Sequence, residues 1–378
     1  MTKNQFSTIL YILTGTVVFL FCSAIVLLNT GDMTTETAAF QNDIGQASTT
    51  NMSSETSVTE SSATEAATET SAVEKNTSVK ETTSEEETTE LITENPTAFI
   101  DADFSAFINE DGDTVASRFI TPAGYVRVTY PENTFASYIQ NYSLKPHGSK
   151  LLLHDGSENK NQTWCAAVFS LPVTHKYIQC ADVIMKLIGN YFYYEKGSDF
   201  FDLLTFRYYC GLVFPYTKFV DGYRHDLTGT PKLVLKKSYD ASENNYLAYM
   251  SNVYCYANTY SLRAQSRKIS LNFMYAGAYF IITAQESAAM GIPASYGHAV
   301  MVVDVAKNPD TGDIAFLLAQ GDTPAEELHV FLNPLHPDDP WYYLSEMTEK
   351  TFSIPFRSFL TSGLYSYNTF FENEIYPN

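Results

Sequence analysis

The chain has 378 residues, a formal net charge of −20, 27 tyrosines and 25 phenylalanines. The acidic balance argues against a nucleic-acid partner, because binding to phosphates requires clustered Lys and Arg. Large apolar residues are concentrated after Pro96, so we expect a single globular domain over residues 96–378. The aromatic residues fit either the core of this domain or a surface that binds sugars or peptides, and the core is favoured.

The N-terminal segment has the composition of a membrane-spanning helix. Ile9 to Leu28 are mostly apolar and uncharged, which is long enough to cross a bilayer. Lys3 precedes this run and the next basic residue is Lys75, so the positive-inside rule places the N-terminus in the cytoplasm. We predict that residues 1–30 form an uncleaved single-pass anchor in the cell membrane, a signal peptide being the alternative.

Residues 31–95 are dominated by Thr, Ser, Glu and Ala. Fourteen acidic residues face two lysines in this segment, and almost no large apolar side chain is present. Such a composition cannot bury enough surface to offset the entropy of ordering. We therefore predict a disordered stalk that holds an extracellular domain away from the membrane, as a spacer crossing a cell wall would.

Three segments of the domain have the spacing of apolar residues that is typical of helices. The first runs from Thr134 to Tyr142, and the third covers roughly Tyr246 to Ala257. In the second, Thr174 is the predicted N-cap and Gly197 the stop, which places Cys180 in the second turn on the apolar stripe. A strand is expected around residues 203–214.

The stretch from Ser295 to Asp322 predicts an antiparallel hairpin. Two apolar runs flank a turn cluster at residues 308–312. If the loop is centred near Asp310, paired residue numbers sum to about 620, which places His298 opposite Asp322 with Gln320 as its diagonal neighbour. Asp304 would lie towards the turn, roughly 20 Å from His298. A histidine held beside a polar partner is the arrangement in which thiol hydrolases orient a base.

Cys180 is the candidate nucleophile, because a thiol near a helix start with a histidine nearby can be activated. Its expected place in the second turn weakens the effect of the helix dipole, and a cysteine on an apolar helix face is more often part of the core. Cys165, Cys180, Cys210 and Cys255 would permit two disulfides outside the membrane, but their apolar surroundings favour free core thiols.

The histidines lack the spacing of a zinc motif, and the glycines do not form a phosphate-binding loop. We therefore expect neither a metal nor a cofactor.

Several blocks of residues, in a fixed order, resemble the bacterial family known as domain of unknown function 4846 over residues 118–360. They are Arg118-Phe119, Pro122-Ala123-Gly124-Tyr125, Phe135-Ala136-Ser137-Tyr138, Leu144-Lys145-Pro146, Asp155-Gly156, Lys160-Asn161-Gln162, Gln179-Cys180-Ala181-Asp182, Tyr256-Ala257-Asn258-Thr259, Ser261-Leu262, Gly297-His298-Ala299, Leu317-Leu318-Ala319-Gln320 and Pro340-Trp341-Tyr342. The chain departs from the family pattern at residues 321–324 and 275–278. The resemblance brings no activity with it, but Cys180 and His298 both fall in matching blocks.

A helix that bears Cys, followed by strands that bear His and then a polar residue, is the order found in papain-like hydrolases, including peptidoglycan amidases of the CHAP type. This is an analogy between architectures. We therefore predict an α+β fold, with an antiparallel sheet and packed helices in a papain-like arrangement.

Two functions follow from these expectations. The first is a cysteine hydrolase or amidase that acts on peptide or amide bonds of the cell wall, with Cys180 as nucleophile, His298 as base, and Asp322 or Gln320 orienting the imidazole. The second is a non-catalytic module at the cell surface that binds glycan or peptide through tyrosines of residues 191–194 and 254–260 and Tyr296. The expected partners are cell-wall glycan or peptide, and the membrane through the N-terminal helix.

Overall fold

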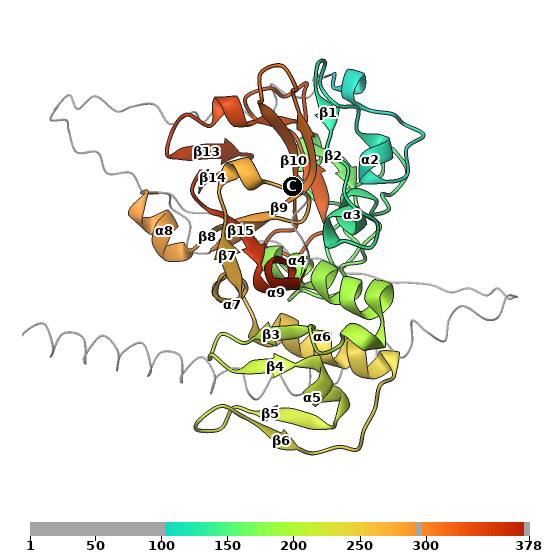
Figure 1. The fold of residues 1–378 in the computed structure, drawn as a ribbon, viewed down its shortest axis with the longest axis vertical. Coiled ribbons are helices and arrows are strands. Elements are labelled where there is room, and N and C mark those ends of the chain that lie inside the picture. Colours follow the sequence, from blue (N-terminus) through green and yellow to red (C-terminus); the bar gives the residue numbers. More distant parts are fainter. Residues whose placement is uncertain (1–102, 292–296, 374–378) are drawn as a thin grey trace, which may run out of the picture. The chain divides into compact units, whose positions relative to one another are not determined.

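The computed structural model describes residues 103–291 and 297–373 (Figure 1). These residues lie in one compact unit, which spans residues 99–378. The unit combines antiparallel sheets with helices, so the predicted α+β class is confirmed. The predicted anchor and stalk fall outside the described residues. Within the described part of the chain, no helix is both long and apolar enough to span a membrane.

A nine-stranded antiparallel sheet forms the centre of the domain. Its strands follow the order β2-β11-β10-β9-β8-β15-β7, with β1 paired to β9 and β12 paired to β10. The bounds are β1 Val126–Arg127, β2 Cys165–Val168, β7 Ser266–Lys268, β8 Tyr279–Ile282, β9 His298–Lys307, β10 Ile314–Gln320, β11 His329–Phe331, β12 Tyr342–Tyr343 and β15 Leu364–Tyr367.

The hairpin of β9 and β10 is the longest pairing in this sheet and has the predicted register. Ile314 pairs with Lys307 beside the turn and Ala319 pairs with Met301 beyond a bulge, so the sums of paired numbers are 621 and 620. Gly312 in the turn has φ 75°, a conformation that glycine adopts readily. The sequence prediction for the hairpin is therefore confirmed, and the two strands bring His298 and Gln320 to the same end of the sheet.

The two faces of the hairpin pack against different elements, because successive strand residues point to opposite faces. Met301, Val303 and Leu317 belong to a core shared with helix α4. Val300, Val302 and Leu318 belong to a second core shared with Phe359, on the small hairpin of β13 (Thr351–Ile354) and β14 (Arg357–Leu360). Both faces are buried, which explains why β9 and β10 read as nearly continuous apolar runs.

Helix α4 (Cys180–Asn190) begins later than the sequence predicted. The N-cap is Gln179 and not Thr174, so Cys180 is the first helical residue. The carboxylate of Asp182 accepts a hydrogen bond from the Gln179 N–H at 3.1 Å, which stabilises this start. One π-helical turn, Tyr191–Lys196, continues the helix, and Gly197 at φ 77° ends it as predicted.

Strands β3 to β6 and helices α5 and α6 lie together at the end of the domain away from β1 and β13 (Figure 1). The predicted helices at 134–142 and 246–257 are confirmed as α3 and α6, whereas the expected strand at 203–214 is a hairpin, β3 with β4. The bounds are α2 Val115–Arg118, α3 Phe135–Gln140, α5 Tyr216–Val220, α6 Glu243–Tyr256, α7 Thr259–Ala264, α8 Ala284–Ala289, α9 Asn368–Asn373, β3 Thr205–Arg207, β4 Val213–Pro215, β5 Tyr223–Asp226 and β6 Lys232–Leu235.

Many tyrosines fill the core between α4, α5 and α6, as the composition suggested. Tyr216, Tyr246 and Tyr249 are almost completely buried, and Tyr193 stacks on Tyr246 with ring centroids 4.0 Å apart. Stacked and edge-to-face pairs of this kind contribute beyond their buried area, so these rings serve packing. Tyr194, by contrast, is exposed.

Candidate active site

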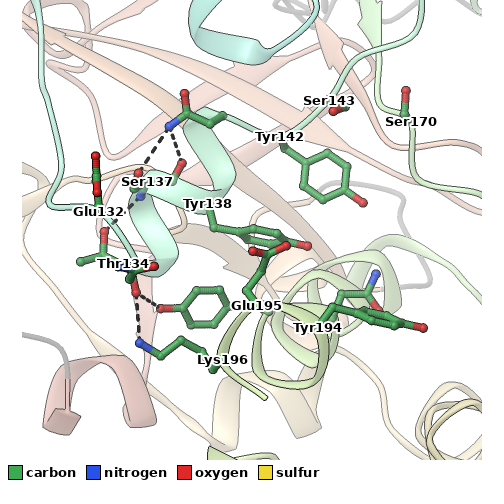
Figure 2. Close-up of a pocket in the computed structure, with 14 residues that line it drawn as sticks. Glu132, Thr134, Ser137, Tyr138, Tyr142, Ser143, Ser170, Tyr194, Glu195 and Lys196 are labelled. Atoms are coloured by element: carbon green, nitrogen blue, oxygen red, sulfur yellow. Dashed lines mark hydrogen bonds between the residues drawn. The ribbon is translucent and has the colours of Figure 1, made fainter. Parts of the chain in front are cut away.

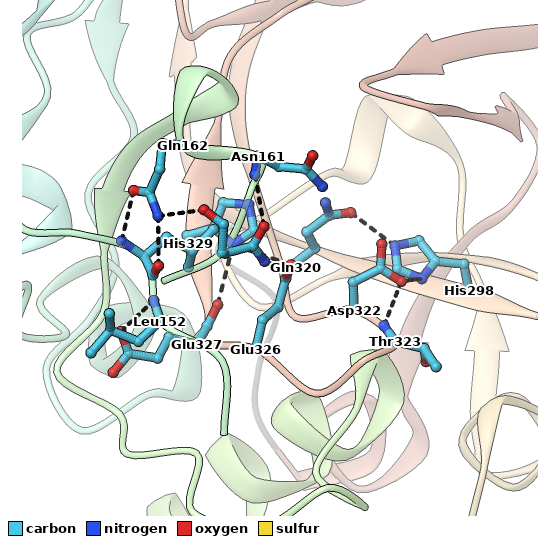
Figure 3. A network of polar contacts seen from close by, with 12 residues as sticks. Leu152, Asn161, Gln162, His298, Gln320, Asp322, Thr323, Glu326, Glu327 and His329 are labelled. Atoms are coloured by element: carbon cyan, nitrogen blue, oxygen red, sulfur yellow. Dashed lines mark hydrogen bonds and ion pairs between the residues drawn. The ribbon is translucent and has the colours of Figure 1, made fainter. Parts of the chain in front are cut away.

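His298 opens β9 and is 1% exposed. Its Nε2 lies 2.8 Å from Oε1 of Gln320, which is hydrogen-bond distance (Figure 3). Its Nδ1 lies 3.8 Å from Oδ1 of Asp322, which is beyond it. With the amide oxygen of Gln320 as acceptor, Nε2 carries the proton and Nδ1 keeps its lone pair. Of the two predicted orienting groups, Gln320 makes the hydrogen bond and Asp322 makes the longer contact.

Asp322 is held by Arg357, a residue that the sequence prediction did not include. The Arg357 guanidinium donates to Oδ1 of Asp322 at 2.5 Å, and the Thr323 N–H donates to the same oxygen at 2.7 Å. His298 and Arg357 keep the pKa of Asp322 below its usual value in spite of burial. Burial lowers the pKa of His298, and the Asp322 carboxylate opposes that shift. The imidazole is therefore neutral at rest, beside an ion pair.

Cys180 is buried at the N-terminus of α4, where the helix dipole is strongest. Burial nevertheless raises the pKa of its thiol to about 12, and the carboxylates of Asp322 and Asp182 add to the rise. The backbone N–H of Ala299, which directly follows His298, and the Arg357 guanidinium both lower it. The same ion pair thus affects the pKa of Cys180 and the pKa of His298. The His298 ring packs on Phe359 with ring centroids 5.9 Å apart, whereas Ala299, whose N–H faces the Cys180 thiol, points to the α4 side of β9.

A pocket of about 300 Å³ opens beside the start of α4. Gly297 and Thr323, the neighbours in sequence of His298 and Asp322, form part of its wall, whereas His298 and Asp322 do not line it. The other lining residues are Tyr177, Gln179, Cys180, Ala181, Asp182, Tyr254, Ala257, Asn258, Thr259, Tyr260 and Ala284. Tyr254 and Tyr260 were predicted to line a cleft, and they lie at this one.

Cys180 and Ala181, the first two residues of α4, line the pocket. The amides of Asp182 and Val183 both donate to the Gln179 carbonyl. Those of Cys180 and Ala181 have no backbone acceptor among the described residues. The first N–H groups of a helix have no partner within it, so they can bind an oxygen that carries negative charge.

A second polar cluster contains His329, Glu326 and Asn159 (Figure 3). It adjoins the first, because His329 on β11 pairs with Gln320 on β10. Nδ1 of His329 lies 3.6 Å from Glu326, which also accepts a hydrogen bond from Asn159. Burial raises the pKa of Glu326 to about 8, and burial lowers the pKa of His329 to about 4. Both groups are therefore largely neutral at pH 7. The sequence prediction did not include them.

The larger pocket, about 800 Å³, lies between α3 and the end of α4 (Figure 2). Tyr138, Tyr142 and Tyr194 line it together with Glu132, Glu195 and Lys196. Of the tyrosines at 191–194 that were expected to form a binding cleft, Tyr191 and Tyr194 lie here, whereas Tyr193 packs in the core. Tyr296 falls outside the described residues.

The four cysteines after the predicted anchor carry thiols and not disulfides. Cys180 is buried, Cys165 and Cys255 are half-buried, and Cys210 is exposed. The interpretation as free thiols is correct, but the placement of Cys210 in the core is wrong, because this residue lies in the tight turn between β3 and β4. Within the described ranges, no three His, Cys, Asp or Glu residues are grouped so that they could hold a metal ion.

The fold and the cluster define an α+β domain with Cys180 at the start of α4 and a buried His298–Gln320–Asp322 cluster at the open end of the β9–β10 hairpin. The chain belongs to the family described as domain of unknown function 4846, whose model matches residues 115–365. The match covers more than half of the chain and confirms the resemblance found over residues 118–360. Comparison with curated proteins and with solved structures gave no match.

Proposed function

We propose that the domain is a cysteine hydrolase of peptide or amide bonds, with Cys180 as nucleophile and His298 as general base. The observation that supports it best is the position of Cys180 as the first residue of α4, at a pocket whose wall includes the neighbours of His298 and Asp322. Papain-like enzymes use a helix-borne cysteine and a strand-borne histidine, and the proposal rests on this analogy of architecture.

The resting protonation states require that proton transfer accompany the attack. Because burial raises the pKa of Cys180 and lowers that of His298, the resting pair is a neutral thiol and a neutral imidazole. Nδ1 of His298 takes the thiol proton as the sulfur bonds to the substrate carbonyl carbon. The carbonyl oxygen gains negative charge, and the N–H groups of Cys180 and Ala181 stabilise it.

The second half of the reaction restores the enzyme. The C–N bond breaks as the leaving nitrogen takes the proton from His298, which leaves the acyl group on Cys180 as a thioester. His298 then takes a proton from water, and the resulting hydroxide oxygen bonds to the carbonyl carbon. The thioester breaks, the sulfur regains the proton, and a carboxylic acid leaves. Gln320 keeps Nε2 protonated throughout, so that Nδ1 remains the basic nitrogen.

The substrate class follows from the expected location. A membrane anchor over residues 1–30 and a stalk over residues 31–95 would place the domain outside the cell. The cell wall is the polymer within its reach there, and it contains peptide and amide bonds. The test is digestion of purified wall by residues 96–378, with the parent protein and with Cys180→Ala. Release of new amine termini by the parent alone is expected. Equal release by both proteins would contradict the role of Cys180.

The pocket in Figure 2 favours a second function, a module that binds glycan or peptide without cleaving it. Tyrosine rings with carboxylates and amides around them are the groups that stack on and hydrogen-bond to sugars. In that case both proteins bind wall fragments equally and neither releases amines. Tyr142→Ala combined with Tyr194→Ala would then weaken retention on wall, whereas Tyr209→Ala, an exposed tyrosine away from this pocket, would leave it unchanged.

A further inference from the structure

Asp182 carries a buried carboxyl oxygen that the fold leaves without a partner. The residue is 6% exposed, and it lines the pocket that Cys180 lines. Its Oδ2 accepts the N–H of Gln179, but Oδ1 has no hydrogen-bond partner among the described residues. A buried acceptor without a partner costs roughly 1–3 kcal/mol, so structures retain one where a ligand completes it.

We infer that Asp182 binds the free amino group of the substrate, which makes the pocket specific for peptides or amides with an unblocked amine end. This inference rests on the proposed hydrolase and names the class of its substrate. Among the described residues that line the pocket, none is Lys or Arg, and Asp182 is the one carboxylic acid. A bound ammonium group would place a positive charge beside Asp182, which no described residue lining the pocket does.

The protonation state of Asp182 agrees with an incoming cation. Burial raises the pKa of this carboxyl well above its usual value, and the opposing effects are backbone hydrogen bonds from Gln179 and from Asp182 itself. Tyr254, the titratable neighbour across the pocket, is also neutral, because burial raises its pKa and the Asp182 carboxyl adds to the rise. Binding of an ammonium group would therefore ionise Asp182 and release its proton.

The spacing along α4 fixes how far the amine lies from the bond that is cut. Cys180 and Asp182 are the first and third residues of the helix, so their Cα atoms lie about 5.4 Å apart. One extended residue spans about 3.3–3.6 Å. Side chains two residues apart on a helix diverge, so the amine site and the sulfur are farther apart than the Cα atoms. Cleavage should therefore fall within the first few peptide bonds from the amine end.

Hydrolysis of matched substrates tests the inference. The probes are a synthetic tripeptide library with free amino ends and the same library acetylated at those ends. We expect the parent protein to cleave the free library at least about 30-fold faster, the range of a charge-assisted hydrogen bond. Asp182→Asn keeps an oxygen for the Gln179 N–H and a donor at the pocket but loses the charge, so it should reduce the rate on the free library alone.

Equal cleavage of both libraries by the parent would overturn the inference and leave the proposed hydrolase intact. Full activity of Asp182→Asn on the free library would overturn it as well, because a neutral hydrogen-bond donor would then suffice. Thermal unfolding of Asp182→Asn shows whether its fold is kept, and the comparison of libraries on the parent protein holds in either case.

Binding to Cys180→Ala separates the inference from catalysis. Ultrafiltration followed by mass spectrometry should show that this variant retains free tripeptides and not acetylated ones. Calorimetry on the retained peptides, in two buffers of different ionisation enthalpy, should show release of a proton that Cys180→Ala/Asp182→Asn does not release. If Cys180→Ala retains neither library, the amine site does not exist, whatever the parent hydrolyses.

Discussion

Both ends of the β9–β10 hairpin bury a carboxylate beside an arginine, and one of the two ends also adjoins a pocket. Near the turn, Asp304 is fully buried, and Oδ2 accepts from Arg127 at 2.8 Å while Oδ1 accepts from Gln140 at 2.7 Å. At the other end, Asp322 pairs with Arg357 beside a neutral His298, and a pocket adjoins the cluster. A polar group whose acceptors are all filled stabilises the fold, whereas one that faces a pocket with unfilled partners is available to a ligand.

This comparison predicts opposite consequences at the two ends, and the largest is at Cys180. Cys180→Ala should lower hydrolysis by at least about 1,000-fold, because the nucleophile is removed. The free energy of unfolding should change by only about 1 kcal/mol, since the substitution removes one buried atom. Denaturant unfolding and amine release measure the two effects, and Cys210→Ala, at an exposed thiol, is the matched control. Loss of activity in the control as well would break the comparison.

Arg127→Ala should lower the stability of the fold and leave the hydrolysis rate nearly unchanged, which is the reverse of Cys180→Ala. The substitution leaves the Asp304 carboxylate buried without its cation, and burial already raises the pKa of this group. We expect a loss of about 2–3 kcal/mol in the free energy of unfolding, below the usual range for a buried pair because the Arg127 side chain is 25% exposed. The rate per folded molecule should stay within about twofold. Lys307→Ala is the control for unfolding, because Lys307 is an exposed residue of β9, the strand that carries Asp304.

Gln320→Leu should lower hydrolysis by about 10- to 100-fold, because the imidazole loses the acceptor that holds Nε2. Gln320→Glu retains an acceptor and should keep more activity, with the acidic limb of its pH–rate profile moved to higher pH since a carboxylate favours the charged imidazole. A purely structural role for Gln320 would reduce both variants without moving the profile.

Glu326 makes the stability of the domain depend on pH. Its folded pKa of about 8 lies above the usual 4.5, so the folded state holds a proton that the unfolded state has lost. Stability from this group is present below about pH 4.5 and falls as the pH rises towards about 8, by at most about 1.4 kcal/mol per pH unit. His329 acts in the other direction, and its contribution is lost as the pH falls from about 6.5 towards about 4.

Glu326→Gln should therefore flatten the decline between about pH 6.5 and pH 8 in urea unfolding. Between about pH 4.5 and pH 6.5 it removes the effect that opposes His329, so the loss of stability on acidification should become steeper. Glu346→Gln, at a residue that pairs with a half-exposed histidine, is the control. An identical slope above pH 6 in the parent protein and Glu326→Gln would show that Glu326 does not carry a proton in the folded state.

The sequence predicted what depends on local pattern. The turn at residues 308–312 and the apolar runs on either side were sufficient to place His298 near Gln320 and Asp322, because register follows from the turn. The start of α4 was missed, since Thr174 is a better N-cap by type than Gln179 and the capping role of Asp182 was not recognised. The pattern Gln179-x-x-Asp182 before an apolar run was the available signal.

Other parts of the site depend on tertiary packing that no local pattern encodes. Arg357 reaches Asp322 from β14, and its position depends on how the β13–β14 hairpin packs against the sheet. The burial of Asp182 follows from Tyr254 and α7 closing over the helix start, whereas an acidic residue in a first helical turn is ordinarily exposed.

The proposed reaction requires a covalent acyl intermediate on Cys180. The most direct test is the mass of the protein after acid quenching during turnover of the free tripeptide library, followed by digestion to locate any adduct. We expect an acyl fragment on the segment that contains Cys180, removed by hydroxylamine as thioesters are, and absent from Cys180→Ala. Turnover with the acyl group on another residue, or at an unchanged rate in Cys180→Ala, would contradict it.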